Sequence, residues 1–156
     1  MELAMHQNWP ESADPLSLTL LKIARMQELF KSVIEVCASE YQLQHSDFSV
    51  LAALRRSPKP YCLSPTLLYK SMFFSSGGLT KVLTRLVSAN LIERIDNPLD
   101  KRGKLVKLSK KGKLLVETIL PKIHDKNKIL LKGLSKEEQL TLENLLQQAL
   151  DNYESM

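Results

Sequence analysis

Apolar residues recur at intervals of three and four along the first and last parts of the chain, and in shorter runs through its middle. This spacing predicts amphipathic helices over residues 14–40 and 109–153, the second interrupted at Gly133. A first helix of about 25 residues is long for a small domain, so we expect part of its apolar stripe to pack on another chain. The stripe consists of Leu20, Ile23, Ala24, Phe30, Val33, Ile34 and Cys37.

Residues that favour helix ends indicate where these helices begin. Asp14-Pro15 combines an N-cap residue with a proline in the first turn. Ser109 is a second N-cap candidate. Ser135 and Glu138 have the spacing of a capping box and predict the start of the last helix.

The middle of the chain predicts two helices followed by a β-hairpin. A serine and a proline open the segment 64–71, and two serines open the segment 75–89, after which Asn90 suits the left-handed position that ends a helix. Short apolar runs at 91–95 and 104–108 predict strands, and the turn-rich loop 96–103 lies between them. This order is the layout of a winged helix-turn-helix with a hairpin wing.

We therefore predict a mostly α-helical fold with a small β-hairpin wing, in one domain over 1–156. The winged-helix lobe would span 46–108 and include a further helix over 46–57. The long helices over 14–40 and 109–153 would flank this lobe.

The charge of the chain is concentrated in this predicted lobe. Residues 55–113 hold fourteen Lys and Arg but three Asp and Glu, a net charge of +11, whereas the rest of the chain carries −6. A basic module between acidic ends is typical of a protein that binds a polyanion. The alternative is a solvated lysine-rich surface.

Several classes of protein find no support in the sequence. The chain has no apolar run of the roughly 18 residues that would span a membrane, and no signal peptide pattern, so we expect a cytoplasmic protein. No catalytic grouping and no phosphate-binding loop is present, so we predict no enzyme activity and no cofactor. The two cysteines and three histidines lack metal-site spacing, and we predict no metal.

Small polar and basic residues on the helix over 75–89 suggest contact with double-stranded DNA. Hydroxyl groups and cations reach base edges and phosphates in a major groove, and residues at helix starts can bind phosphate. Taken alone, this helix could equally be an ordinary amphipathic helix. The candidate residues are Ser64, Thr66, Ser75, Ser76, Gly77, Thr80, Lys81, Thr84 and Arg85.

The predicted loop 96–103 strengthens the DNA interpretation. Its tip carries Lys101 and Arg102, and a basic tip can enter a narrow minor groove. Asp100 is placed to orient Arg102 through a carboxylate–guanidinium pair. A solvated hairpin turn is the alternative.

These segments resemble the MarR (multiple antibiotic resistance regulator) family of bacterial transcription factors. The matching features are the helix-turn-helix over 63–94, the wing pattern Asp100-Lys101-Arg102, and the run from Val106 to Gly112. The resemblance extends over 14–153; the family usually has Ser or Thr after the wing arginine, where this chain has Gly103.

The resemblance implies a homodimer, joined through the helices over 14–40 and 109–153, that binds a pseudo-palindromic operator. It further implies a regulator of stress response, most often a repressor, that a small lipophilic or phenolic effector releases from DNA. The candidate effector pocket is Met26, Phe30, Phe48, Tyr69, Phe73 and Phe74, although aromatic residues at helical spacing are more often simply part of a core. Some relatives sense oxidants through a cysteine near the start of the first helix, and this chain has none there.

A second function, from a different class, is a winged-helix module for protein–protein assembly without specific DNA binding. That function would favour a neutral or acidic second helix and a wing tip without arginine. Lys81, Arg85 and Arg102 argue against it.

Overall fold

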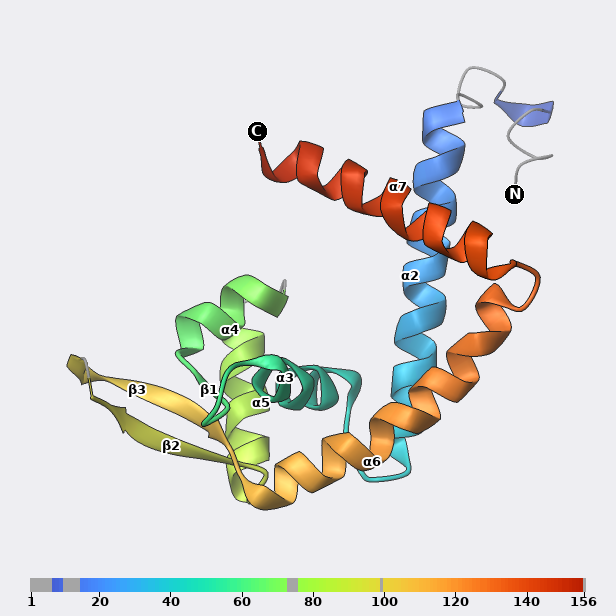
Figure 1. The fold of residues 1–156 in the computed structure, drawn as a ribbon. Coiled ribbons are helices and arrows are strands. Elements are labelled where there is room, and N and C mark those ends of the chain that lie inside the picture. Colours follow the sequence, from blue (N-terminus) through green and yellow to red (C-terminus); the bar gives the residue numbers. More distant parts are fainter. Residues whose placement is uncertain (1–6, 10–14, 73–75, 99, 156) are drawn as a thin grey trace.

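The computed structural model describes residues 7–9, 15–72, 76–98 and 100–155. Three long helices lie beside a lobe that consists of three shorter helices and a small sheet (Figure 1). The predicted fold class is confirmed. In chain order the elements are α2 (Pro15–Ser39), α3 (His45–Arg56), β1 (Cys62–Leu63), α4 (Pro65–Met72), α5 (Ser76–Ser88), β2 (Ile92–Asn97), β3 (Asp100–Leu108), α6 (Lys110–Asn127), the 3-10 helix η2 (Lys128–Leu131) and α7 (Lys136–Glu154).

The sheet has strand order β1-β3-β2 and is antiparallel throughout. Cys62 pairs with Lys107, and Ile92 pairs with Leu108. The two hairpin strands reach further than the sequence indicated, because pairing continues past the predicted strand ends into the loop, with an irregularity at Asp96 and Asn97. The result is a long, narrow hairpin that projects beyond the helices (Figure 1).

The core lies where α3 meets α5, the sheet and α6. Val50, Leu51 and Leu54 on α3 are fully buried. Fully or almost fully buried side chains from the surrounding elements complete it, namely Cys37, Leu68, Leu86, Ile92, Val106 and Ile119. Because one face of α5 is buried in this core, the opposite face is left available at the surface.

A close joint connects the end of α5 to the start of α6. Asn90 has the left-handed φ of 59° that ends α5, as the sequence predicted for this position. The Ser109 hydroxyl caps α6 by accepting from the Gly112 amide at 2.9 Å and donates to the Asn90 carbonyl at 2.8 Å. A Cβ atom on Gly112 would lie 2.1 Å from the Leu91 carbonyl oxygen, so only glycine fits there.

Ion pairs attach α6 to the elements on either side of it. The Arg55 Nε atom donates to Glu117 Oε1 at 2.7 Å, which joins α3 to α6. Lys122 donates to Glu40 at 2.6 Å, which joins α6 to the end of α2. The Lys122 hydrogen bond lowers the pKa of the Glu40 carboxyl. Both pairs are exposed, so they orient α6 more than they stabilise it.

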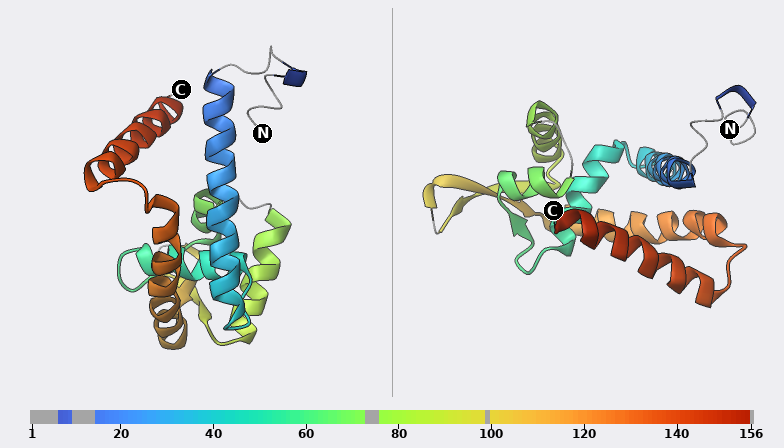
Figure 2. Two further views of the ribbon diagram at one scale, coloured as in Figure 1. Left: turned by 90° about the vertical axis from the view of Figure 1, so that its right-hand side faces the viewer. Right: turned by 90° about the horizontal axis from the view of Figure 1, so that it is seen from above.

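The first and last helices carry apolar residues that the chain itself does not cover. On α2, Leu20, Ile23 and Phe30 are exposed, whereas Cys37 and Ala38 near its end are buried. On α7 every residue from Leu140 to Asn152 is exposed. Both views in Figure 2 show α7 separated from α2 for most of its length. None of the described helices is long and apolar enough to cross a membrane.

Candidate nucleic-acid interface

Ser64 stands directly before helix α4, and its hydroxyl accepts a hydrogen bond from the Leu67 amide at 3.2 Å. The predicted N-cap is therefore present, and this hydroxyl is engaged by its own helix. Thr66 is exposed in the first turn. Leu68 is fully buried and fixes α4 on the core.

Helix α5 has the two faces that its sequence predicted. Leu79, Val82 and Leu83 are buried with Leu86, and the opposite face exposes Thr80, Lys81 and Thr84. The Thr84 hydroxyl donates to the Thr80 carbonyl at 3.0 Å and keeps its lone pairs for a further donor. Ser75, the side chain of Ser76 and the exposure of Gly77 lie outside what the structure describes.

Arg85 differs from its neighbours on α5 because its guanidinium turns toward the start of α3. Its Nη2 atom donates to Asp47 Oδ1 at 2.8 Å and to Gln44 Oε1 at 2.9 Å, with Ser46 Oγ at 3.4 Å. Gln44 is the N-cap of α3. Asp47 is almost fully buried and also accepts from the Gln44 amide at 2.9 Å.

Sequence reasoning missed this cluster, although a signal for it exists. A glutamine three residues before an aspartate can form a capping box, which occupies one carboxylate oxygen of the aspartate. When that carboxylate is buried, its second oxygen requires a donor from elsewhere in the chain. Arg85, on the neighbouring helix, is that donor.

The hairpin of β2 and β3 forms the predicted wing. Lys104 pairs with Asp96 across the two strands. The backbone of Asp100, Lys101 and Arg102 opens β3, so these residues lie at the outer end of the hairpin. Their side chains are outside the described part of the structure.

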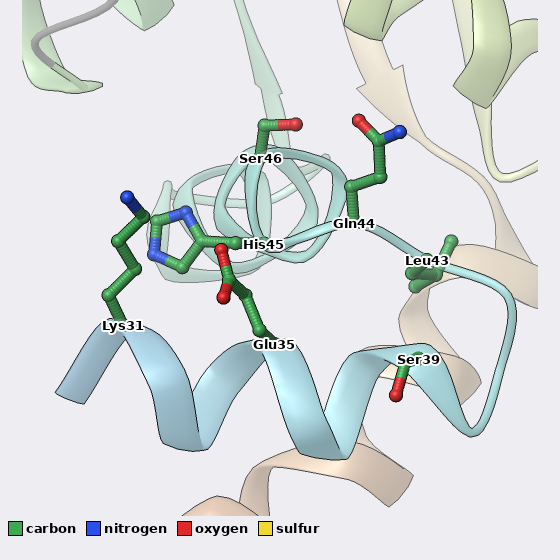
Figure 3. Close-up of a pocket in the computed structure, with 7 residues that line it drawn as sticks. All are labelled: Lys31, Glu35, Ser39, Leu43, Gln44, His45 and Ser46. Atoms are coloured by element: carbon green, nitrogen blue, oxygen red, sulfur yellow. The ribbon is translucent and has the colours of Figure 1, made fainter. Parts of the chain in front are cut away.

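Two adjoining pockets lie along α2. One, of about 460 Å³, lies between α2 and the start of α3, with the His45 imidazole over α2 beside Lys31 and Glu35 (Figure 3). Burial lowers the pKa of His45, while Glu35 acts to raise it and Lys31 to lower it. The remaining residues that line this pocket are Ser39, Leu43, Gln44 and Ser46.

The second pocket is an apolar groove of about 640 Å³ between α2 and α7. It shares Lys31 and His45 with the first pocket, and it contains Met26 and Phe30 of the predicted effector pocket. Phe48 instead belongs to the core, and Tyr69 is exposed on α4. Phe73 and Phe74 are not among the described residues. Of the four predicted residues that the structure describes, it brings Met26 and Phe30 together.

Comparison with known proteins gives consistent matches over most of the chain. A family model described as the MarR family matches residues 41–103. The multiple antibiotic resistance protein MarR of Escherichia coli is 31% identical over 145 residues, which cover 90% of this chain and 99% of that protein. The HTH-type transcriptional regulator PecS of Dickeya dadantii is 27% identical over 129 residues, 83% of this chain and 78% of that protein.

Solved structures agree with these matches. A cysteine-to-serine mutant of E. coli MarR complexed with operator DNA has a TM-score of 0.73 and 31% identity, covering 94% of this chain and 97% of that chain. A MarR family transcriptional regulator from Streptomyces coelicolor has a TM-score of 0.75 at 20% identity, covering 91% and 97% of the two chains, which is a likeness of fold alone.

Proposed function

The chain belongs to the MarR family of transcription regulators, and on that premise we propose that it is a sequence-specific DNA-binding repressor that acts as a homodimer on a pseudo-palindromic operator. The observation that carries this proposal is the exposed polar and basic face of α5 beside a projecting hairpin, on a lobe segment with a net charge of +11.

In this proposal α5 enters the major groove. Thr80, Lys81 and Thr84 lie on its exposed face and are the side chains that would meet base edges and phosphates. The wing would lie along the adjacent minor groove, with Arg102 at its tip and Asp100 to orient it. Ser64 and Thr66 at the start of α4 would be close to the phosphate backbone.

The homodimer would form through α2, α6 and α7. Leu145, Leu146 and Leu150 on α7 are exposed, as are Leu20 and Ile23 on α2. Contiguous apolar surface of this kind marks an interaction site. A second copy of the chain supplies the matching apolar faces, and the two-fold symmetry of such a dimer fits a pseudo-palindromic operator.

We infer further that a small phenolic or lipophilic effector releases the protein from DNA. The place that suits it is the junction of the two pockets, where Met26 and Phe30 offer apolar contact beside Lys31 and His45. An aromatic ring would lie against the first pair, and a hydroxyl or carboxylate group would meet the second pair. A titration of the operator complex with 4-hydroxybenzoate, with Lys31→Ala as the weakened variant, tests this site.

The principal experiment is a salt titration of binding to DNA from upstream of the protein's own gene, beside a shuffled duplex. We expect a specific excess of roughly a thousandfold and a log–log salt slope of about −0.9 for each phosphate neutralised. Arg102→Ala should lower specific affinity at least about tenfold, whereas Lys136→Ala, an exposed cation on α7, should not. Absence of binding at low salt would favour the protein-assembly function instead.

A further inference from the structure

We propose that Arg85 is a positioning residue for operator recognition: it holds α5 against the start of α3 through Asp47 and does not itself contact DNA. This inference rests on the proposed DNA-binding function. It departs from the sequence-based expectation, which placed Arg85 among the DNA contacts.

The geometry shows why the guanidinium remains with α3. A single nitrogen, Nη2, serves Asp47, Gln44 and Ser46, at 2.8, 2.9 and 3.4 Å. The Asp47 side chain is 4% exposed. Moving Arg85 to a phosphate would leave a buried carboxylate without its cation, which is a strongly unfavourable arrangement.

The contact between Arg85 and Asp47 also gives α5 a directional interaction, which its apolar face lacks. Burial of Val82, Leu83 and Leu86 holds α5 on the lobe, but apolar packing has little directional preference. A charge-assisted hydrogen bond is directional, and this one joins residues 38 positions apart in the chain. It therefore fixes the rotation of α5, and with it the direction in which Lys81 and Thr84 point.

The same cluster borders the pocket beside α2. Gln44 and Ser46 line that pocket (Figure 3), and both side chains also accept a hydrogen bond from Arg85. The orientation of α5 and the wall of the pocket thus depend on shared side chains.

The test is a double-mutant cycle on operator binding with Arg85→Gln, Asp47→Asn and the double variant. Asp47 is buried, so its effect on DNA binding can act only through the fold. We expect each single variant to lose about tenfold or more in specific affinity, the double variant to lose no more than Arg85→Gln alone, and the salt slope to stay unchanged. Lys81→Gln is the matched control on the same helix, and it should flatten the slope by about 0.9 and combine multiplicatively with Asp47→Asn.

Two results would overturn the positioning role. One is a flatter salt slope for Arg85→Gln with little effect of Asp47→Asn, because that is the signature of a phosphate contact. The other is losses that multiply in the double variant.

A second measurement needs no DNA and separates this inference from the proposed function. Amide hydrogen exchange of residues 79–88 should be about tenfold faster in Arg85→Gln and in Asp47→Asn than in the wild type, relative to the amides of α6. Unchanged exchange would contradict the positioning role even if the operator is found. Faster exchange in both variants, together with a wild-type protein that shows no operator preference, would refute DNA recognition while leaving the α3–α5 contact established.

Discussion

The lobe and the terminal helices of this chain differ in how far their apolar side chains are buried. In the lobe, α3 is surrounded on several sides, and Val50, Leu51 and Leu54 are fully buried within the single chain. Helix α7 contains five leucines in 19 residues, yet no residue from Leu140 to Asn152 is buried. The lobe therefore supplies its own core, whereas the terminal helices present apolar faces that this chain leaves uncovered.

The largest effect that this contrast predicts is on assembly. Leu145→Asp places a charge in the apolar face of α7, and a charge buried without a partner costs about 3–5 kcal/mol. We expect the variant to sediment as a monomer at concentrations where the wild type is a dimer. Asn144→Asp adds the same charge on the polar side of the helix and should remain dimeric. If both variants kept the assembly state of the wild type, α7 would not be the interface.

The next effect belongs to the lobe alone. Gly112→Ala forces a Cβ to within 2.1 Å of the Leu91 carbonyl oxygen, so the backbone has to shift. We expect a loss of about 1–3 kcal/mol in the free energy of unfolding, measured by urea denaturation. Gly133→Ala is the control, because nothing lies within 4 Å of its added Cβ. Equal losses at the two glycines would show that the joint is not tightly packed.

Two N-cap residues, Ser109 before α6 and Ser135 before α7, allow the packed region and the exposed helix to be compared directly. Ser109 caps α6 and also donates to Asn90, so Ser109→Ala should cost about 1–2 kcal/mol. Ser135 caps the exposed α7, where its hydroxyl accepts a hydrogen bond from the Glu138 backbone amide at 3.2 Å. Ser135→Ala should cost about 0.5 kcal/mol. Chemical denaturation of both variants at one protein concentration compares the two regions directly. A larger cost at Ser135 would reverse the contrast.

The smallest effect is expected where the two regions meet, at His45. Burial lowers its pKa, so the folded protein favours the neutral imidazole and the unfolded chain binds the proton first as pH falls. This contribution to stability is present above the ordinary histidine pKa of about 6.5 and is lost as pH falls through the folded-state value. His45→Gln should therefore lose less stability between pH 7.5 and 5.5 than the wild type, measured by urea denaturation at the two pH values.

Short-range patterns in the sequence were sufficient to predict helix ends and the buried face of α5. Asn90, the Ser135 capping box and the buried face of α5 were predicted because each depends on residues a few positions apart. The family was recognised from the same segments and is confirmed, as is the expectation that the chain is not an enzyme, since its relatives are transcription regulators.

The misses have a common physical cause. Arg85 meets Asp47 across 38 positions, and no local pattern specifies which basic residue of α5 turns inward. Helical spacing likewise did not distinguish Phe48, which is buried in the core, from Phe30, which lines the groove between α2 and α7. The DNA-binding residues, their wing partners and the domain limits stay predictions.

The glycine joint at the start of α6 has a mechanical consequence. Because Gly112 packs directly against Leu91, the start of α6 is held beside the end of α5, and this joint is the pivot for any tilt of α6 as an arm. At 1.5 Å per residue, its 18 residues extend about 27 Å. A tilt of about 10° at the pivot moves the far end by about 5 Å, more than the roughly 3.4 Å rise of one base pair. In the homodimer that we propose, the tilt of this arm would set the distance between the two copies of α5, and with it the spacing of the operator half-sites that both copies can bind.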